Sequence, residues 1–421
     1  MTRTTLWMCA VLSVVAIVAG GSPAAVAETR APHANVMISA DGDFTRANGV
    51  RSGDGSKAHP YDISGWRIAN LTIQNTDKWV SIHNNSITSR LVLDWIGDKL
   101  NMQHNVVNDM RLNQNVARTG MMTSGLISHN QFVTVGQLRH WDGVFADNVV
   151  GTKNNLGAQA VNFDGFNGAH FVHNTIYGYV DARLHGHHHS SGWGKPSHDH
   201  TMDAAHEDPT MHRYRYHEVT IADNAIYSTN SYALAYLDTG HSGNDRTAPS
   251  ETDQNLNLPH IHYTKVHIVG NRLYGAGILV NTFNASDNLH PWFARGYVDI
   301  QNNRITLDQD PFWTFKQLNG IEVDQAQAVT MHITGNSISG WRPGADDPLA
   351  FLEGFDSNAG ILLNTVDDAD ISIMHTRVTN RVYGVHAMQM TAKVHWMIRD
   401  LQTSGVDHPV SYDSNVANKP G

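Results

Sequence analysis

Pairs of carboxylates stand at alternate positions of short apolar segments. Glu322 and Asp324 are separated by one residue in the segment 320–324, while Asp181 and Asp238 come from two other segments of the same type. In an extended strand, residues i and i+2 point the same way, with Cα atoms about 6.5 to 7 Å apart. Hydrolysis of a glycosidic bond requires two carboxyl groups at a defined spacing, one acting as an acid and the other as a base or nucleophile. These four residues are therefore candidate catalytic groups.

A second chemistry, β-elimination of a uronic acid polymer, is also open to residues of these segments. Elimination needs a cation or an amide to neutralise the substrate carboxylate, and a base to remove the neighbouring proton. Arg183 fits the first role, and Tyr236 or His386 fits the second. Hydrolysis and elimination therefore remain alternatives. The side chains expected to bind the substrate are two amides, an indole and an imidazole: Asn281, Asn364, Trp193 and His241.

Histidines are concentrated in one insertion. Nine of the 27 histidines fall between residues 185 and 217, together with several acidic residues. Imidazole suits zinc and copper, and the single cysteine, Cys9, lies far away in the N-terminal segment. The spacing matches no strict metal-binding motif, so a polar, pH-sensitive lid is the alternative interpretation. The candidate ligands of a divalent metal (zinc, copper or calcium) are His185, His187, His189, His198 and His200.

The candidate catalytic residues belong to segments that share one pattern. Several of these segments begin with glycine and then alternate apolar and polar residues, as in 277–281, 320–324 and 360–364. The alternation predicts short strands whose apolar side chains point inward and whose polar side chains point outward. Because stacked strands lie about 4.8 Å apart, we expect the outward residues to form one polar field. Insertions at about 185–217 and 238–262 should stand beside this field, where long loops commonly carry function.

A repeat organises most of the chain. Its pattern is two apolar residues in alternation, two variable positions, Asn, one variable position and an apolar residue, as in Val219-Thr-Ile-Ala-Asp-Asn224-Ala-Ile226. The Asn position is filled nine times: Asn85, Asn105, Asn130, Asn148, Asn174, Asn224, Asn271, Asn303 and Asn336. Intervals of roughly 20 residues suit one coil of a parallel β-solenoid, and longer intervals suit a coil with an insertion. Each Asn is expected to point inward at a turn and to stack on the Asn of the next coil.

This repeat resembles those of the right-handed parallel β-helix superfamily, which includes many carbohydrate-binding and carbohydrate-cleaving proteins. The resemblance covers roughly residues 50–405, and the segment 53–68 is similar to the start of NosD-like periplasmic β-helix proteins. The predicted fold class is all-β, a single-stranded right-handed parallel β-helix of roughly 11–13 coils with two long loop insertions. The same scaffold hosts lyases, hydrolases, epimerases, adhesins and metal-handling proteins, so the resemblance implies fold more firmly than function.

The N-terminal 27 residues have the composition of a secretory signal peptide. Arg3 precedes an apolar stretch, and an Ala-x-Ala site ends at Ala27. We therefore expect a secreted or periplasmic protein without stable membrane insertion, a β-helix domain over 28–410 and a flexible tail over 411–421. The oligomeric state is left open.

Charge and composition narrow the choice of partner. The formal net charge is −10 with only 29 Lys and Arg, which disfavours nucleic acid because no basic stripe is present to neutralise phosphates. The leading hypothesis is an exported protein that cleaves a polysaccharide or oligosaccharide, as a lyase or a glycoside hydrolase. The alternatives are a NosD-like protein that handles copper or zinc, and a surface protein that binds carbohydrate without catalysis.

Overall fold

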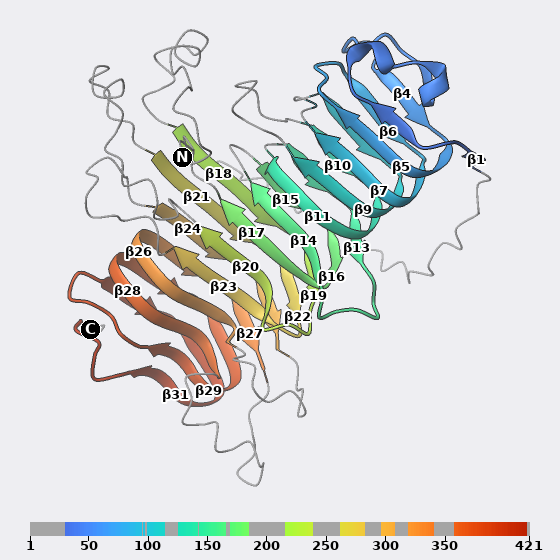
Figure 1. Ribbon diagram of the computed structural model, residues 1–421. Helices are drawn as coiled ribbons and strands as arrows, with labels where there is room; N and C mark the ends of the chain where they lie inside the picture. The colour runs from blue at the N-terminus through green and yellow to red at the C-terminus, as the bar shows by residue number, and fades with distance from the viewer. Residues whose placement is uncertain are drawn as a thin grey trace, which may run out of the picture.

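The chain folds as an all-β protein with one large, mostly parallel sheet (Figure 1). The computed structural model describes residues 30–94, 96, 99–113, 125–141, 143–165, 169–184, 215–238, 262–282, 296–307, 319–340 and 358–418. Within these residues there is no α-helix, and two short 3-10 helices, Asp41–Asp43 and Arg46–Asn48, lie near the start. Strands follow one another along the molecule in chain order, from the N-terminal end to the C-terminal end.

Three series of parallel strands make up the sheet, and the first series precedes each Asn turn. Its members pair successively from β4 to β30, and the long strands β26 and β28 contribute their second halves. The strands are β4 (Tyr61–Ser64), β6 (Val80–His83), β8 (Leu100–Gln103), β10 (Leu126–Ser128), β12 (Val144–Ala146), β15 (Ala169–Val172), β18 (Arg215–Ala222), β21 (His262–Val269), β24 (Gly296–Gln301), β26 (Ile321–Thr334), β28 (Ala359–Met374) and β30 (His395–Arg399).

The second series follows each Asn turn. It consists of β1 (Ala31–Pro32), the first residues of β5 (Trp66–Gln74), β7 (Ser86–Asp94), β9 (Val106–Asn113) and β11 (Gln131–Trp141), then β13 (Val149–Gly151), β16 (Thr175–Tyr177), β19 (Ala225–Tyr227), β22 (Arg272–Tyr274), β25 (Arg304–Thr306), β27 (Ser337–Ser339), and the first residues of β29 (Arg377–Ala387) and β31 (Gln402–Tyr412).

The third series carries the candidate catalytic residues. It consists of β2 (Val36–Ile38), the last residues of β5, β7, β9 and β11, then β14 (Gln159–Gly165), β17 (Tyr179–Leu184), β20 (Tyr232–Asp238), β23 (Gly277–Thr282), the first halves of β26 and β28, and the ends of β29 and β31. The short strand β3 (Val50–Ser52) pairs with β4 in the one antiparallel contact among the described strands.

The predicted Asn column is confirmed by its hydrogen bonds. The backbone N–H of Asn224 donates to Oδ1 of Asn271 at 3.0 Å, and Nδ2 of Asn224 donates to the carbonyl of Phe171 at 2.9 Å. Equivalent bonds run from Asn85 to Asn336, and these asparagines are buried. The residue before each Asn adopts positive φ, which explains the Asn, Asp, His and Gly found there. The column therefore satisfies backbone groups that a tight turn would otherwise leave buried and unpaired.

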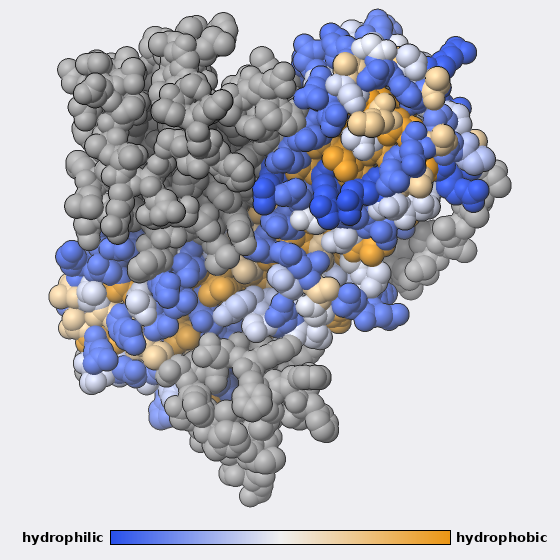
Figure 2. Space-filling model, in the orientation of Figure 1, coloured by the Kyte–Doolittle hydropathy of each residue, from blue (hydrophilic) through white to orange (hydrophobic). Residues whose placement is uncertain are grey.

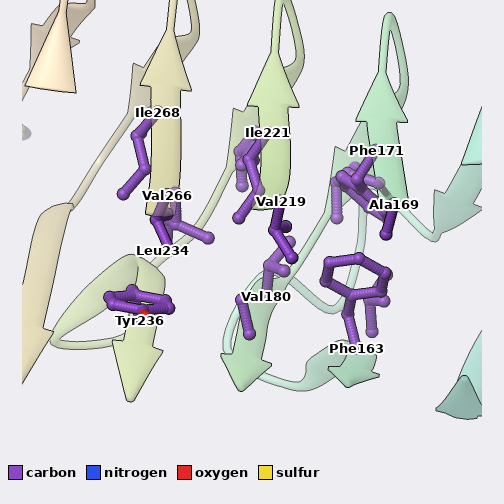
Figure 3. Packing of buried hydrophobic residues seen from close by; sticks show 14 of the residues in the cluster. Phe163, Ala169, Phe171, Val180, Val219, Ile221, Leu234, Tyr236, Val266 and Ile268 are labelled. Carbon is purple, nitrogen blue, oxygen red and sulfur yellow. The ribbon is translucent and has the colours of Figure 1, made fainter. Parts of the chain in front are cut away.

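Apolar side chains from the three series fill the interior. Leu234 and Tyr236 of β20 lie with Val266 and Ile268 of β21 in the space between two layers of strands (Figure 3). Hydrophilic residues predominate over much of the described surface in view, with apolar residues between them (Figure 2). No helix among the described residues has the length and apolar character that crossing a membrane would demand.

The C-terminal segment packs against the preceding strands. Asn418 Nδ2 donates to the carbonyl oxygen of Val394 at 3.1 Å, and Trp396 Nε1 donates to the carbonyl oxygen of Asn418 at 2.6 Å. Val416 is buried. Residues of the tail predicted over 411–421 therefore contact the last strands through a buried valine and these hydrogen bonds.

Candidate active site on the third series

On β26 the third series presents two outward acids, Glu322 and Asp324, and each forms a row with the residues that pair with it on the neighbouring strands. Only the row of Asp324 is polar on both sides of β26. Glu322 pairs with Leu279 on one side and with Leu362 on the other, so its row is interrupted by apolar residues. Asp324 pairs with Asn281 and Asn364, so its row presents a carboxylate between two amides. The single polar field expected from the sequence is therefore a local polar group bordered by leucines.

Tyr236 does not belong to this group, contrary to the sequence prediction. The register of β20 shifts between Tyr232, which pairs with Gly277, and Leu234, which pairs with Ile278. This inserts one extra residue, and a shift of one residue moves every later side chain to the opposite face. Tyr236 consequently pairs with Ala182 and Val280 and is only 2% exposed within the core (Figure 3).

The same shift changes the neighbours of Asp238. In the register, Asp238 pairs with Leu184 rather than with Arg183, which pairs with Leu237. The side chains of Asp238 and Arg183 are not described. The pairing of Asp181 with Asp238 as a second set of carboxylates therefore gains no support from the register.

Glu322 is the most buried acid of the group. It alternates with Ile321 and Val323, which face the core, yet Glu322 itself is only 5% exposed. Asn319 Nδ2 donates to Glu322 Oε2 at 3.0 Å. Oδ1 of Asn319 accepts from the backbone N–H groups of Asn358 and Ala359, at 3.2 and 3.0 Å, which fixes the orientation of the amide. Asn319 therefore holds the Glu322 carboxyl group in a defined position.

Asp324 is held in a similar way but is less buried. Asn364 Nδ2 donates to Asp324 Oδ1 at 2.9 Å. The pair of Glu322 and Asp324, called here the carboxylate pair, thus receives a hydrogen bond from one amide on each acid. No Lys or Arg ion pair to either acid occurs within the part of the chain that the structure describes.

The environment favours the protonated form of both acids. Burial raises the pKa of Glu322; the hydrogen bond from Asn319 opposes this rise, and the charge of Asp324 adds to it. Burial also raises the pKa of Asp324, while hydrogen bonds from Asn364 and from the backbone of Gln325 oppose the rise. Two nearby acids with raised pKa values are typical of sites where one carboxyl group donates a proton and another accepts one.

Two residues that the sequence did not single out belong to the same group. Burial, and then the charges of Glu322 and Asp324, raise the pKa of Tyr232 to about 12, so its phenol remains a proton donor. Tyr232 pairs with Gly277 in the register of β20 and β23. The other residue is Asn319. The available signals were an aromatic residue opening the segment 232–238 and an amide directly before Gly320.

The remaining predicted residues of this face lie apart from the carboxylate pair. Asp181 is three strands away from Glu322, about 14 Å at the usual strand spacing, and accepts a hydrogen bond from Gln159 at 3.2 Å. His386 is separated from Glu322 by Leu362, stacks on Tyr383 and lies 3.7 Å from Asp413. Asn281, by contrast, lies directly beside Asp324 in the register.

The other candidates lie outside the described residues. These are Trp193, His241 and the proposed metal ligands His185, His187, His189, His198 and His200, together with the signal peptide over 1–27. No protein-family model, curated protein or solved structure matches the chain. The geometry of the described residues is therefore the basis for assigning a function.

Proposed function

We propose that the three series of strands wind as a right-handed parallel β-helix, and that the protein is an exported carbohydrate-active enzyme acting on a polysaccharide or oligosaccharide. Successive pairing of equivalent strands and the buried Asn column support the winding. The right-handed sense follows from the strong preference of parallel crossover connections. Export rests on the signal-like composition of residues 1–27.

The reaction we favour is hydrolysis of a glycosidic bond by the carboxylate pair. Glu322, the more buried acid, is assigned as the general acid that protonates the departing oxygen. Asp324, which is less buried, is assigned the complementary role of an ionised carboxylate that accepts a proton. The protonated Tyr232 phenol is assigned as a hydrogen-bond donor to the substrate, and the amides of Asn281 and Asn364 are assigned to bind its hydroxyl groups. The carrying observation is the burial of Glu322 beside Asp324, with an amide donating to each acid and no Lys or Arg ion pair to either within the described residues.

Spacing along the strand bears on the stereochemistry. Side chains at i and i+2 that extend in parallel keep their carboxyl groups about 6.5 to 7 Å apart, close to the lower limit for enzymes that invert the anomeric centre. In that case Asp324 is a general base that activates water rather than a nucleophile. We therefore expect the first product to have the inverted anomeric configuration.

Elimination is less favoured by the same geometry. A uronic acid substrate carries a carboxylate that the site must neutralise, whereas this group holds two acids in a protein of net charge −10. Tyr236, one of the bases expected for elimination, is buried in the core, and His386 lies beyond Leu362. Hydrolysis of a neutral polysaccharide consequently fits the described residues better.

A substrate screen tests the proposal directly. The full-length secreted protein would be incubated with neutral and uronic acid polysaccharides, with reducing ends and absorbance at 235 nm both followed. New reducing ends without absorbance support hydrolysis, while absorbance marks elimination and overturns it. Binding without turnover across the panel would replace catalysis with the carbohydrate-binding alternative. Asp181→Asn is the matched control, since it removes a carboxylate of the same series three strands away.

A further inference from the structure

A second group of polar side chains lies on the first series, away from the carboxylate pair. His267 of β21, Asp299 of β24 and His332 of β26 pair in adjacent strands, so their side chains share one row. Glu218 and Tyr297 contact this row from neighbouring positions. These five residues are called here the histidine–aspartate cluster. Nothing in the proposed hydrolysis uses them.

Both ring nitrogens of His267 face carboxylate oxygens. Nε2 lies 3.1 Å from Glu218 Oε1, and Nδ1 lies 3.0 Å from Asp299 Oδ2. A neutral imidazole carries one N–H, so it can donate to only one of these oxygens. With the proton on Nε2, the lone pair of Nδ1 faces the Asp299 carboxylate, and a positive species must stand between them. That species is either a second proton or a metal cation.

Asp299 points to the same requirement. It is 6% exposed, and among the described residues Oδ1 makes no hydrogen bond although it lies 3.4 Å from His332 Nδ1. A buried carboxylate is costly unless it is paired or coordinates a metal. Lys265 stands 3.6 Å from Glu218 and neutralises that acid, so with both imidazoles neutral the cluster and Lys265 together keep one net negative charge.

We propose that His267, Asp299 and His332 bind a divalent metal ion of the Zn²⁺ type, which replaces the shared proton. Zinc bonds of 2.0–2.1 Å to nitrogen and oxygen place tetrahedral ligands about 3.3 Å from one another. Asp299 Oδ2 lies 3.0 Å from His267 Nδ1 and Oδ1 lies 3.4 Å from His332 Nδ1, so each carboxylate oxygen stands near that spacing from one imidazole. No three His, Asp or Glu side chains of the described residues are placed to hold an ion as they stand, so binding requires both imidazoles to turn toward Asp299 and any proton between them to leave.

Glu218 and Tyr297 are assigned as positioning residues. Histidines that bind metals usually donate their other N–H to a carboxylate, which is the contact between His267 Nε2 and Glu218. The Tyr297 hydroxyl lies 3.0 Å from Nδ1 of His332, and it must turn aside when that nitrogen binds the ion.

Zinc titration of the full-length protein made without a histidine tag tests this site. Calorimetry and metal analysis after dialysis would compare the wild type with His267→Ala, Asp299→Asn and His332→Ala. The histidine-rich insertion is a competing source of ligands, so each variant is also made with His187, His188 and His189 replaced by serine. In that background we expect one equivalent of zinc, lost in all three variants, and a 10- to 100-fold weaker affinity in Glu218→Gln.

Two controls keep the result interpretable. His395→Ala removes an exposed imidazole of the same series and should leave the stoichiometry unchanged. Far-UV circular dichroism identifies variants that fail to fold, and Co²⁺ in place of Zn²⁺ should give intense visible absorption in the wild type, as tetrahedral coordination by nitrogen and oxygen requires. Equal zinc stoichiometry in wild type and Asp299→Asn, or no binding in the serine background, overturns the site whatever the outcome for hydrolysis.

Discussion

The carboxylate pair and the histidine–aspartate cluster are built from the same kind of strand, and β26 contributes to both. Glu322 and Asp324 stand on its first half, and His332 stands on its second half. In the first region the acids receive hydrogen bonds from neutral amides, so burial is only partly offset and their pKa values rise. In the second region imidazoles face the acid Asp299. The partner, rather than the strand, decides whether a buried acid is suited to proton transfer or to holding a cation.

The largest expected effect separates the two regions by activity. Glu322→Gln removes the proposed general acid and should lower kcat by about 10²- to 10⁴-fold, the usual contribution of such a group. Asp299→Asn, in the histidine–aspartate cluster, should leave kcat on the same substrate nearly unchanged. Steady-state rates measured from reducing ends give both values. Equal losses in the two variants would contradict the assignment of catalysis to the carboxylate pair.

Stability provides an independent readout for Glu322→Gln. The folded-state pKa of Glu322 is raised, so the folded protein binds more protons than the unfolded chain between the two pKa values. Its carboxyl group therefore lowers the free energy of unfolding as pH rises through that window. Glutamine removes this penalty, and the variant should unfold at a higher temperature than the wild type at pH 7 but not at pH 4. A lower Tm at both pH values would indicate a misfolded variant instead.

The scaffold shared by both regions depends on the Asn column. Asn224→Ala leaves the carbonyl of Phe171 and the backbone N–H of Asn174 without their side-chain partner, at a cost of about 1–3 kcal/mol for each buried group. Denaturant unfolding should show this loss together with reduced zinc binding and reduced activity. The matched control is Asn154→Ala, which changes an exposed asparagine. An unchanged midpoint in Asn224→Ala would contradict the structural role of the column.

Much of this architecture could be predicted from the sequence, because it follows from patterns that repeat. The Asn at each turn and the Gly at the start of strands recur, and they are needed for reasons of hydrogen bonding and close approach. A Cβ at Gly277, for example, would overlap the carbonyl oxygens of Asn319 and Gly320. The carboxylates of Glu322 and Asp324 were also found by alternation, since β26 keeps its register with β23 through both residues.

The missed features share a different cause. The extra residue in β20 turns Tyr236 into the core, and no local pattern marks such a bulge. His267, Asp299 and His332 each occupy an ordinary outward position, and their proximity arises only when strands 30 or more residues apart in the chain pair side by side. The burial of Val416 near the end of the chain could not be predicted, because the residues around it are polar.

The pH dependence of activity sharpens the assignment of roles within the carboxylate pair. Asn364 lowers the pKa of Asp324 by donating a hydrogen bond to it, so Asn364→Ala should raise that pKa further. Because Asp324 must be ionised to act, the acidic limb of kcat should move to higher pH, while the basic limb, set by protonated Glu322, should stay in place. A shift of the basic limb alone would exchange the two roles. Asn380→Ala, at a positive-φ position within β29, is the control.

The smallest expected effect marks where the candidate active site ends. Tyr236→Phe removes a hydroxyl group in the core, so kcat should change by no more than about twofold, although the free energy of unfolding can fall by about 1 kcal/mol. Tyr232→Phe removes the phenol whose pKa is raised by the charges of Glu322 and Asp324. It should reduce kcat by about tenfold, which is the loss expected when one hydrogen bond to the substrate disappears. Parallel kinetics and denaturant unfolding of the two variants measure the contrast. If Tyr236→Phe is instead the slower enzyme at equal stability, the register of β20 must return to the unshifted alignment, with Tyr236 on the outward face beside the substrate.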